Sequence, residues 1–169
     1  MNKIETLFNI GDKIVYPGQG IGVVDCIEEM EFKGERQNYY KIDIVNSTMK
    51  LKLPVSRVEF TNIRLISNSK EIDTDLNNFS DFIVNEEEIK TSTAKERMIT
   101  NTKKIKEGTL NDYLDVICNL TQVKKLSNIN ANEKQVLNST KSLVVEEISQ
   151  SKDLSREEAI ELLENAIRF

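Results

Sequence analysis

The sequence predicts an α+β protein in which a small all-β half precedes an all-α half. Five of the six glycines and both prolines lie within the first 66 residues, where apolar residues recur with a period of two. From Asp73 onward they recur every three to four positions, which is the period of an α-helix. We therefore expect a small Tudor- or SH3-like β-barrel over residues 1–67 and a compact bundle of about five helices over residues 73–169, connected by the polar segment 67–72.

Short strands joined by tight turns account for the β half. The expected strands span residues 14–16, 21–27, 38–44, 49–53 and 62–66. In the third strand Tyr40 and Ile42 alternate with charged residues, as in a strand with one buried face. The same alternation places Lys50 and Lys52 on the outer face of the fourth strand, which Pro54 ends.

Apolar spacing and capping residues define the expected helices. The inner faces contain Leu76, Phe79 and Ile83 in the first helix, and Met98, Thr102 and Ile105 in the second, which spans about 94–107. Residues 84–93 are expected to be the loop between them, and Gly108 ends the second helix. The start signals of the last three helices are Thr109, Asn130 with Glu133, and Ser155 with Glu158.

Composition excludes most catalytic chemistry. The chain has no histidine, so Ser-His-Asp and Cys-His catalysis are absent, and Cys26 and Cys118 are too few for a zinc site or a disulfide framework. Both cysteines lie in apolar contexts and are expected to be reduced core residues of a cytoplasmic protein. We expect no enzyme activity, no cofactor or metal, no small-molecule substrate, and no membrane-spanning segment.

The charge of −5 is unevenly distributed. Residues 1–72 are neutral, residues 73–89 carry six acids and no base, and residues 90–108 have a net charge of +4. The basic stretch includes the helix at 94–107, whose basic and polar side chains are candidates for contacts with DNA phosphates. These candidates are Lys95, Arg97, Asn101, Lys104 and, one position off the same face, Lys103. Lys125 and Lys134 are further candidates if the next loop folds nearby. The alternative interpretation of this stretch is a solvated helix face without a ligand.

Lys50 and Lys52 are the second candidate feature. If their strand lies at the edge of the sheet, it can pair with a strand of a partner while the two lysines contact acidic side chains. The alternative is that the lysines only protect an exposed edge against aggregation.

The N-terminal half has a distinctive set of motifs, which are FNIGDKIVYPGQGIG at residues 8–22, Lys33-Gly34-Glu35, Tyr39-Tyr40 and Leu51-Lys52-Leu53-Pro54. In these motifs the chain resembles the CarD/CdnL family of transcription regulators. The resemblance extends into the helical half through EKQVL at 133–137, so that it covers nearly the whole chain. The N-terminal motifs are also similar to a domain of transcription-repair coupling factor, but their combination with the helical half favours a CarD-like regulator.

This resemblance implies a non-enzymatic bacterial protein with two binding surfaces. A Tudor-like domain binds the β subunit of RNA polymerase by strand addition, and a helical domain contacts promoter DNA at the upstream edge of the bubble without sequence specificity. Lys52 and Pro54 match a basic polymerase contact and the proline after it, and Met30 occupies a contact position where arginine is common. The expected protein is a monomer that modulates the stability of the open complex.

On the helical side, the resemblance implies a DNA face that includes Arg97, Asn101, Lys104 and Lys134. The tryptophan that family members carry about fourteen residues before the glycine is replaced here by Ala94. The alternative function is a protein–protein adaptor that binds polymerase and recruits another protein, rather than DNA, through its helical domain.

Overall fold

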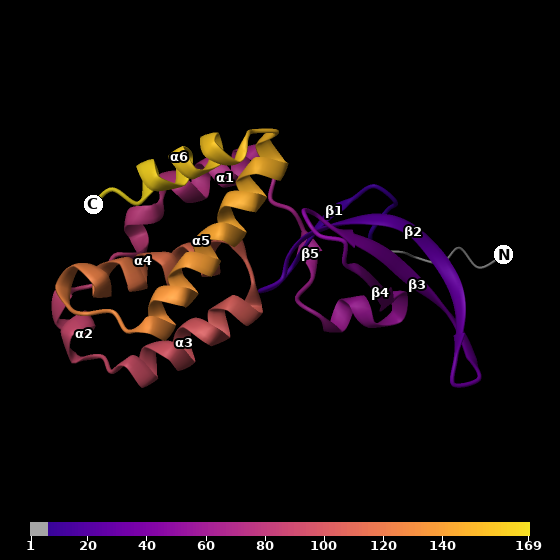
Figure 1. Ribbon diagram of the computed structural model, residues 1–169, viewed down its shortest axis with the longest axis horizontal. Coiled ribbons are helices and arrows are strands. Elements are labelled where there is room, and N and C mark those ends of the chain that lie inside the picture. The colour runs from indigo at the N-terminus through magenta and orange to yellow at the C-terminus, as the bar shows by residue number, and fades with distance from the viewer. Residues whose placement is uncertain (1–6) are drawn as a thin grey trace. The chain divides into compact units, whose positions relative to one another are not determined.

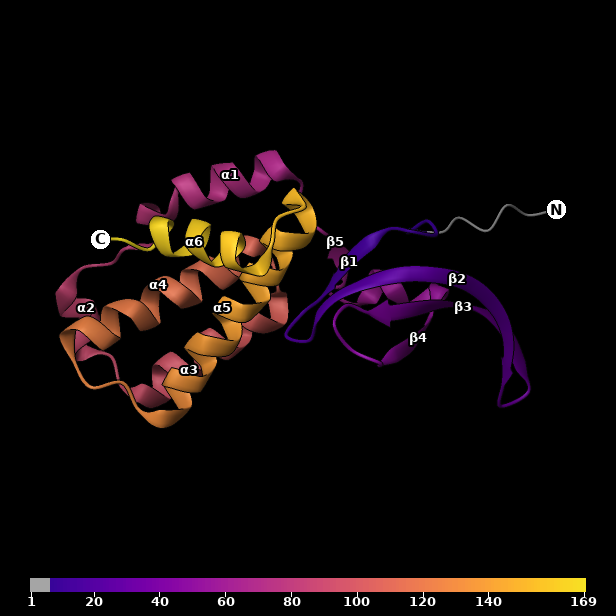
Figure 2. The ribbon, with the colours of Figure 1, turned by 45° about the horizontal axis from the view of Figure 1, so that its top comes forward.

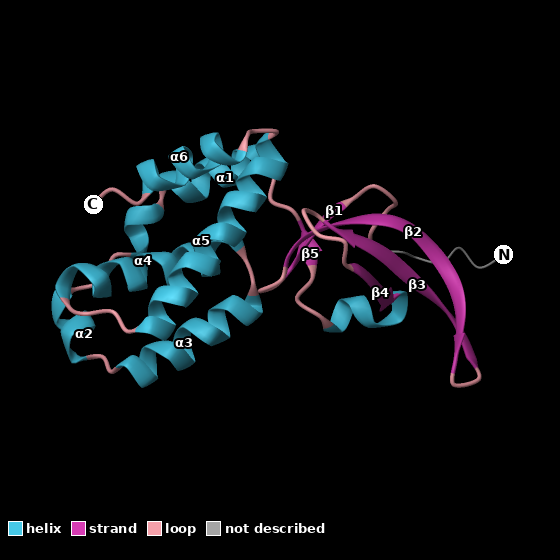
Figure 3. Ribbon diagram, in the orientation of Figure 1, coloured by secondary structure: helices cyan, strands magenta, loops and turns pink. Residues whose placement is uncertain are grey.

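The computed structural model describes residues 7–169, and the chain divides into two compact units, Met1–Ile66 and Ser67–Phe169. The first unit is built on one antiparallel sheet and the second is helical, as Figures 1 and 3 show. The predicted α+β class, with a β half followed by an α half, is therefore confirmed.

The first unit is a five-stranded antiparallel sheet with the strand order β4-β3-β2-β1-β5. The strands are β1 (Lys13–Tyr16), β2 (Gly20–Phe32), β3 (Glu35–Ile44), β4 (Lys50–Pro54) and β5 (Arg64–Leu65), with a 3₁₀-helix η1 (Val55–Phe60) between the last two. No pairing links β4 to β5 in the described sheet, so the sheet is not closed into the expected barrel. Strands β2 and β3 are longer than predicted and form a hairpin that extends beyond the end of β4 (Figure 2).

The core of the sheet follows the predicted alternation. Tyr40 and Ile42 are fully buried, and the Tyr40 hydroxyl accepts a hydrogen bond of 3.1 Å from the backbone N–H of Phe8. Gly22 lies opposite Ile44 where the strands approach closely, and a Cβ atom added to it would overlap Cγ2 of Ile42. This position therefore requires glycine for packing and not for its backbone conformation.

The second unit contains six α-helices and the 3₁₀-helix η2 (Phe79–Phe82) within residues 67–169. The α-helices are α1 (Ser69–Asn77), α2 (Glu86–Thr91), α3 (Ala94–Glu107), α4 (Leu110–Leu126), α5 (Ala131–Lys152) and α6 (Arg156–Ala166). Figure 1 shows α1 and α6 side by side, and α4 is the most buried helix. The predicted capping boxes at Asn130 and Ser155 are confirmed, and Thr109 caps α4 with Asp112.

Four local predictions differ from the structure. Helix α1 begins inside the expected connection, because Asn68 and Glu71 form a capping box and Ile72 is buried. The expected loop at 84–93 contains the short helix α2, which Asn85 caps. Thr102 was expected on an inner face but is exposed, because the phase of helix α3 places Asn101 inward instead. Ile83 is also exposed, because the chain forms η2 just before it and does not continue as an α-helix. Cys26 is half-buried and not a core residue, since its strand neighbour Asp25 occupies a β-bulge.

Replacement of Gly22 by alanine tests the close strand packing. We expect Gly22→Ala to destabilise the first unit by about 1–3 kcal/mol, because the new methyl group overpacks the core against Ile42. Hydrogen exchange should show faster exchange of the β1–β3 amides and unchanged exchange in α4. In an Ile42→Leu background, which lacks Cγ2, the additional cost should be smaller; an equal cost would contradict this packing argument.

Candidate nucleic-acid and protein interfaces

Strand β4 forms one edge of the described sheet and pairs only with β3. Leu51 and Leu53 are partly buried and pack against the core, whereas Lys50 and Lys52 are exposed, as their alternation predicts. The side of β4 away from β3 therefore presents backbone groups that a partner strand can pair with.

The four residues predicted to contact a protein partner share one face of the sheet. Directly paired residues place their side chains on the same side, and alternate residues of β3 do so as well. The pairs are Met30 with Gln37, Lys50 with Asp43, Lys52 with Lys41, and Pro54 with Tyr39. We call the face defined by these eight residues the outer sheet face, since the alternate residues Tyr40 and Ile42 are buried on the other side.

Lys52 carries the available positive charge on the outer sheet face. Lys50 lies 3.5 Å from Asp43, and Lys41 lies 3.8 Å from Glu28. Lys52 is opposite Lys41, and no ion pair within the described residues involves it. Two lysines directly opposite each other repel, so an acidic group from a partner would relieve an unfavourable local field.

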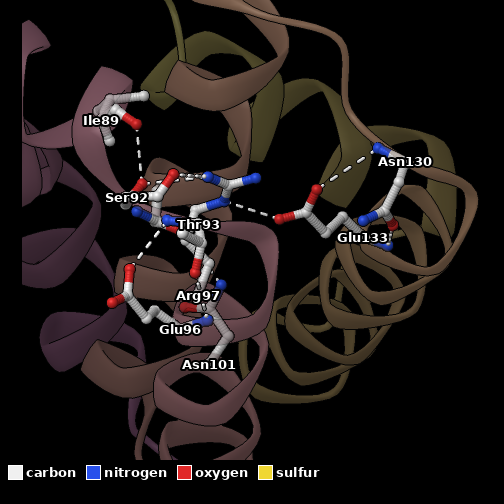
Figure 4. Close-up of polar contacts among 9 residues, drawn as sticks. Ile89, Ser92, Thr93, Glu96, Arg97, Asn101, Asn130 and Glu133 are labelled. Carbon is white, nitrogen blue, oxygen red and sulfur yellow. Dashed lines mark hydrogen bonds and ion pairs between the residues drawn. The ribbon is translucent and has the colours of Figure 1, made fainter.

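The inner face of α3 is polar, and Arg97 is its most buried charge. Its Nε donates to Glu133 Oε1 at 2.7 Å, and its Nη1 donates to the carbonyl of Ser92 at 2.8 Å and to the Ser92 hydroxyl at 3.1 Å (Figure 4). The two charged side chains are only 11% and 1% exposed. Arg97 therefore connects the start of α3 to the start of α5.

Two further side chains continue this polar inner face along α3. Asn101, which is 2% exposed, donates from Nδ2 to Asn119 Oδ1 of α4 at 3.1 Å. Lys104 lies 2.5 Å from Asp115 of the same helix and is 29% exposed. These polar pairs hold α3 against α4. In most helix pairs an apolar stripe makes this contact.

The structure places Arg97 and Asn101, two of the predicted DNA contacts, on the inner face of α3. Both side chains are hydrogen-bonded within the protein, Arg97 to Glu133 and Asn101 to Asn119. Lys104 is held by Asp115, and Ala94 is half-buried in the first turn of α3. Of the predicted DNA contacts, Lys95, Lys103, Lys125 and Lys134 are the exposed cations.

The exposed side of α3 contains two of the predicted cations and one apolar residue that the sequence analysis did not single out. Lys95, Ile99 and Lys103 are spaced four residues apart and therefore form a single stripe, which we call the outer α3 stripe. Sequence reasoning missed Ile99 because it searched the helix for cations. The sequence could have revealed Ile99, because it is an apolar residue that does not share the helix face of Met98 and Ile105, which are half-buried.

Two ionisable groups of the helical unit have pKa values that their surroundings shift. The backbone N–H of Thr93 donates to Glu96 and lowers the pKa of that carboxyl, as a capping box does. Burial, with a smaller effect of Asp115, raises the pKa of the Cys118 thiol to about 11. Within residues 7–169, no three His, Cys, Asp or Glu side chains are grouped to hold a metal ion. None of the described helices is both long and apolar enough to cross a membrane.

Comparisons with known proteins match both units. Residues 8–67 match the family model of the CarD-like/TRCF RID domain, and residues 79–164 match that of the CarD C-terminal domain. The chain is also similar to a protein of Bacillus subtilis (strain 168) named "Putative transcription factor YdeB". The two are 32% identical over 152 residues, which cover 90% of this chain and 97% of the relative.

Removal of Arg97 tests whether the buried ion pair holds α3 in place. We expect Arg97→Met to destabilise the helical unit by about 3–5 kcal/mol, because it leaves the Glu133 carboxylate buried without its partner. In a Cys26→Ser background, labelling of the fully buried Cys118 thiol should become faster. The double variant Arg97→Met/Glu133→Gln should recover part of the loss. Unchanged labelling of Arg97→Met would contradict the role of the ion pair.

Proposed function

The chain belongs to the CarD family of transcription factors, and we propose that it binds the β subunit of RNA polymerase through β4 and the outer sheet face. We further propose that the helical unit contacts promoter DNA at the upstream edge of the bubble. Together, the two contacts would change the lifetime of the open complex without covalent chemistry.

The free charge of Lys52 at an open strand edge carries the polymerase part of this proposal. Strand addition needs unpaired backbone groups, which β4 offers on one side. It also needs side-chain contacts that select the partner, and Lys52 is a cation without an ion pair among the described residues. A strand with acidic side chains fits both requirements.

Exposed lysines support the DNA part. Lys95, Lys103 and Lys134 extend into solvent, and no ion pair within residues 7–169 involves them. Contacts between lysines and phosphates give affinity without base specificity. This agrees with a regulator that binds promoter DNA without sequence specificity. Arg97 and Asn101 point inward, so the proposed DNA surface rests mainly on lysines.

The protein–protein adaptor stays the second candidate. The observation that favours it is the same burial of Arg97 and Asn101, which removes two polar groups from the outer surface of α3. The adaptor hypothesis predicts that the chain binds polymerase and that DNA adds no salt-dependent contribution to this binding.

Charge reversal at Lys52 tests the polymerase contact. We expect Lys52→Glu to weaken binding to an isolated β-subunit fragment by about tenfold or more, because it places an acid against an acidic partner. Arg57→Glu is the matched control, since Arg57 is an exposed cation of the same unit in η1. Circular dichroism should show that both variants fold. Equal affinity of Lys52→Glu and the unmodified chain would refute this contact.

Neutralisation of the α3 lysines tests the DNA contact. In binding to RNA polymerase on a fork-junction promoter DNA, the log of the affinity falls linearly with the log of the salt concentration. Each phosphate contact makes this slope steeper by about 0.9. We expect Lys95→Gln and Lys103→Gln each to reduce this slope by about that amount. Lys124→Gln, at an exposed lysine of α4, is the control. If the slopes do not change while polymerase binding persists, the adaptor hypothesis replaces the DNA contact.

A further inference from the structure

The helical unit contains a cavity of about 220 Å³ between α2, α3 and α4. Part of its wall is apolar and is formed by the Phe82 ring of η2 and the buried side chain of Ile89 in α2. Three carboxamides form part of the polar wall, Asn101 of α3 together with Asn119 and Gln122 of α4. Apolar walls with a few converging polar groups are typical of binding sites for small organic molecules.

Asn101 has hydrogen-bonding capacity that the protein does not use. Its side chain is 2% exposed, and its Nδ2 atom donates to Asn119 Oδ1 at 3.1 Å. Among the described residues, no group donates to Asn101 Oδ1, and Nδ2 of Asn119 finds no acceptor. A buried amide oxygen without a partner is unfavourable, because it has lost hydration that nothing replaces. A ligand that donates to Asn101 and accepts from Asn119 would satisfy both groups.

Gln122 differs from the two asparagines, because both ends of its carboxamide are occupied. Its Oε1 atom accepts from the backbone N–H of Val84 at 3.2 Å, and its Nε2 atom donates to the Val84 carbonyl at 2.9 Å. These bonds hold the segment before α2 against α4 and so keep the edge of the cavity in place. Gln122 therefore shapes the cavity, whereas the asparagines are available to a ligand.

The charges around the cavity favour a neutral ligand. The two cations that line it are each paired with a carboxylate, Arg97 at 2.7 Å and Lys104 at 2.5 Å. A phosphate or carboxylate inside would therefore lose its hydration without gaining an unpaired counter-charge. The lining acids Glu88 and Glu96 are exposed, so a cation would stay at the mouth. Arg97 still offers donors to a neutral ligand, since its Nη2 atom donates to no described residue.

A nucleobase has the chemistry that these groups require. It is flat and uncharged, and its edge presents hydrogen-bond donors and acceptors side by side, which a carboxamide can bind two at a time. Its faces stack on aromatic and apolar side chains, which Phe82 and Ile89 provide here. A sugar would satisfy Asn101 but would leave the apolar wall uncovered, and a hydrocarbon would do the opposite.

We propose that this cavity binds a nucleobase, with Asn101 and Asn119 on its edge and Phe82 and Ile89 against its faces. The volume equals that of about seven water molecules, so the base enters and its sugar stays at the mouth. The base can belong to a free nucleoside or nucleotide, or to an unpaired strand of DNA, because all of these present the same chemistry. This binding goes beyond the proposed contacts with polymerase and duplex DNA and requires neither of them.

Titration of the ¹⁵N-labelled full chain with each of the four 2′-deoxynucleosides tests the proposal by NMR. We expect at least one of them to cause saturable shifts with a Kd below about 1 mM. The side-chain amide signals of Asn101 and Asn119 should move most, because these groups would contact the base directly. Deoxyribose is the control ligand and should leave both signals unchanged.

Thr100→Phe locates the binding in the cavity without removing a buried group. Thr100 is exposed and lines the cavity, so a phenylalanine there fills the mouth and should weaken binding by about tenfold or more. Thr102→Phe is the matched control, since Thr102 is an exposed threonine of the same helix outside the cavity wall. Asn119→Leu should also weaken binding, whereas Asn111→Leu, at an exposed position of α4, should not. Circular dichroism can verify that all four variants fold.

A short single-stranded oligonucleotide of the preferred base distinguishes the two sources of the ligand. If it binds more tightly than the nucleoside, and Thr100→Phe or abasic sites in the strand remove the gain, the base belongs to a DNA strand. If it binds no better, the ligand is a free nucleoside or nucleotide.

The proposal is overturned if no nucleoside moves the Asn101 and Asn119 signals, or if Thr100→Phe and Thr102→Phe bind equally well. Because these titrations contain neither polymerase nor duplex DNA, that result would leave the proposed function standing. Conversely, failure of the lysine variants to change the salt slope would refute the duplex contact and leave the cavity proposal intact.

Discussion

The ion pair between Arg97 and Glu133 determines which side of α3 faces solvent. Its two charges are almost completely buried, and each forms a further hydrogen bond, from Arg97 to Ser92 and from the backbone of Asn130 to Glu133. A buried pair of this kind tolerates little rotation of either helix, because a displaced charge would lose its partner in a poorly solvated environment. Asn101 and Lys104 add polar pairs along the same face, so α3 cannot turn without breaking all three.

Once the inner face is fixed, the outer face consists of what remains. Lys95, Ile99 and Lys103 are exposed because Arg97, Asn101 and Lys104, on the other side of α3, make the contacts with α4 and α5. In the β unit, burial of Tyr40 and Ile42 has the corresponding effect, since it leaves Lys52 and its neighbours on the outer sheet face. Each proposed interface therefore lies on the side of its element opposite a buried face. Each unit has to be folded and packed before its interface is formed.

Sequence reasoning succeeded where the signal is local. Alternation in residues 38–44 and 49–53 identified the inward faces of β3 and β4, and caps such as Thr109 and Asn130 located helix starts within a residue. It did not place Arg97 on the inner face of α3, because the partner, Glu133, is 36 residues away and already has a local role in a capping box. Arginine and lysine on a helix are normally exposed, so nothing near Arg97 in the sequence distinguishes it from Lys95. Helix α2 was missed because six residues are too few to show a period.

We propose that α3 presents its lysine side to DNA while its arginine side holds the fold together. Photo-crosslinking from an unnatural amino acid at position 103, in the complex of the full chain with RNA polymerase and promoter DNA, tests this directly. Position 124, on α4, provides the comparison. The account predicts crosslinks from position 103 to the upstream DNA duplex and none from position 124. Crosslinks from position 103 only to polymerase, or to no component of the complex, would contradict it.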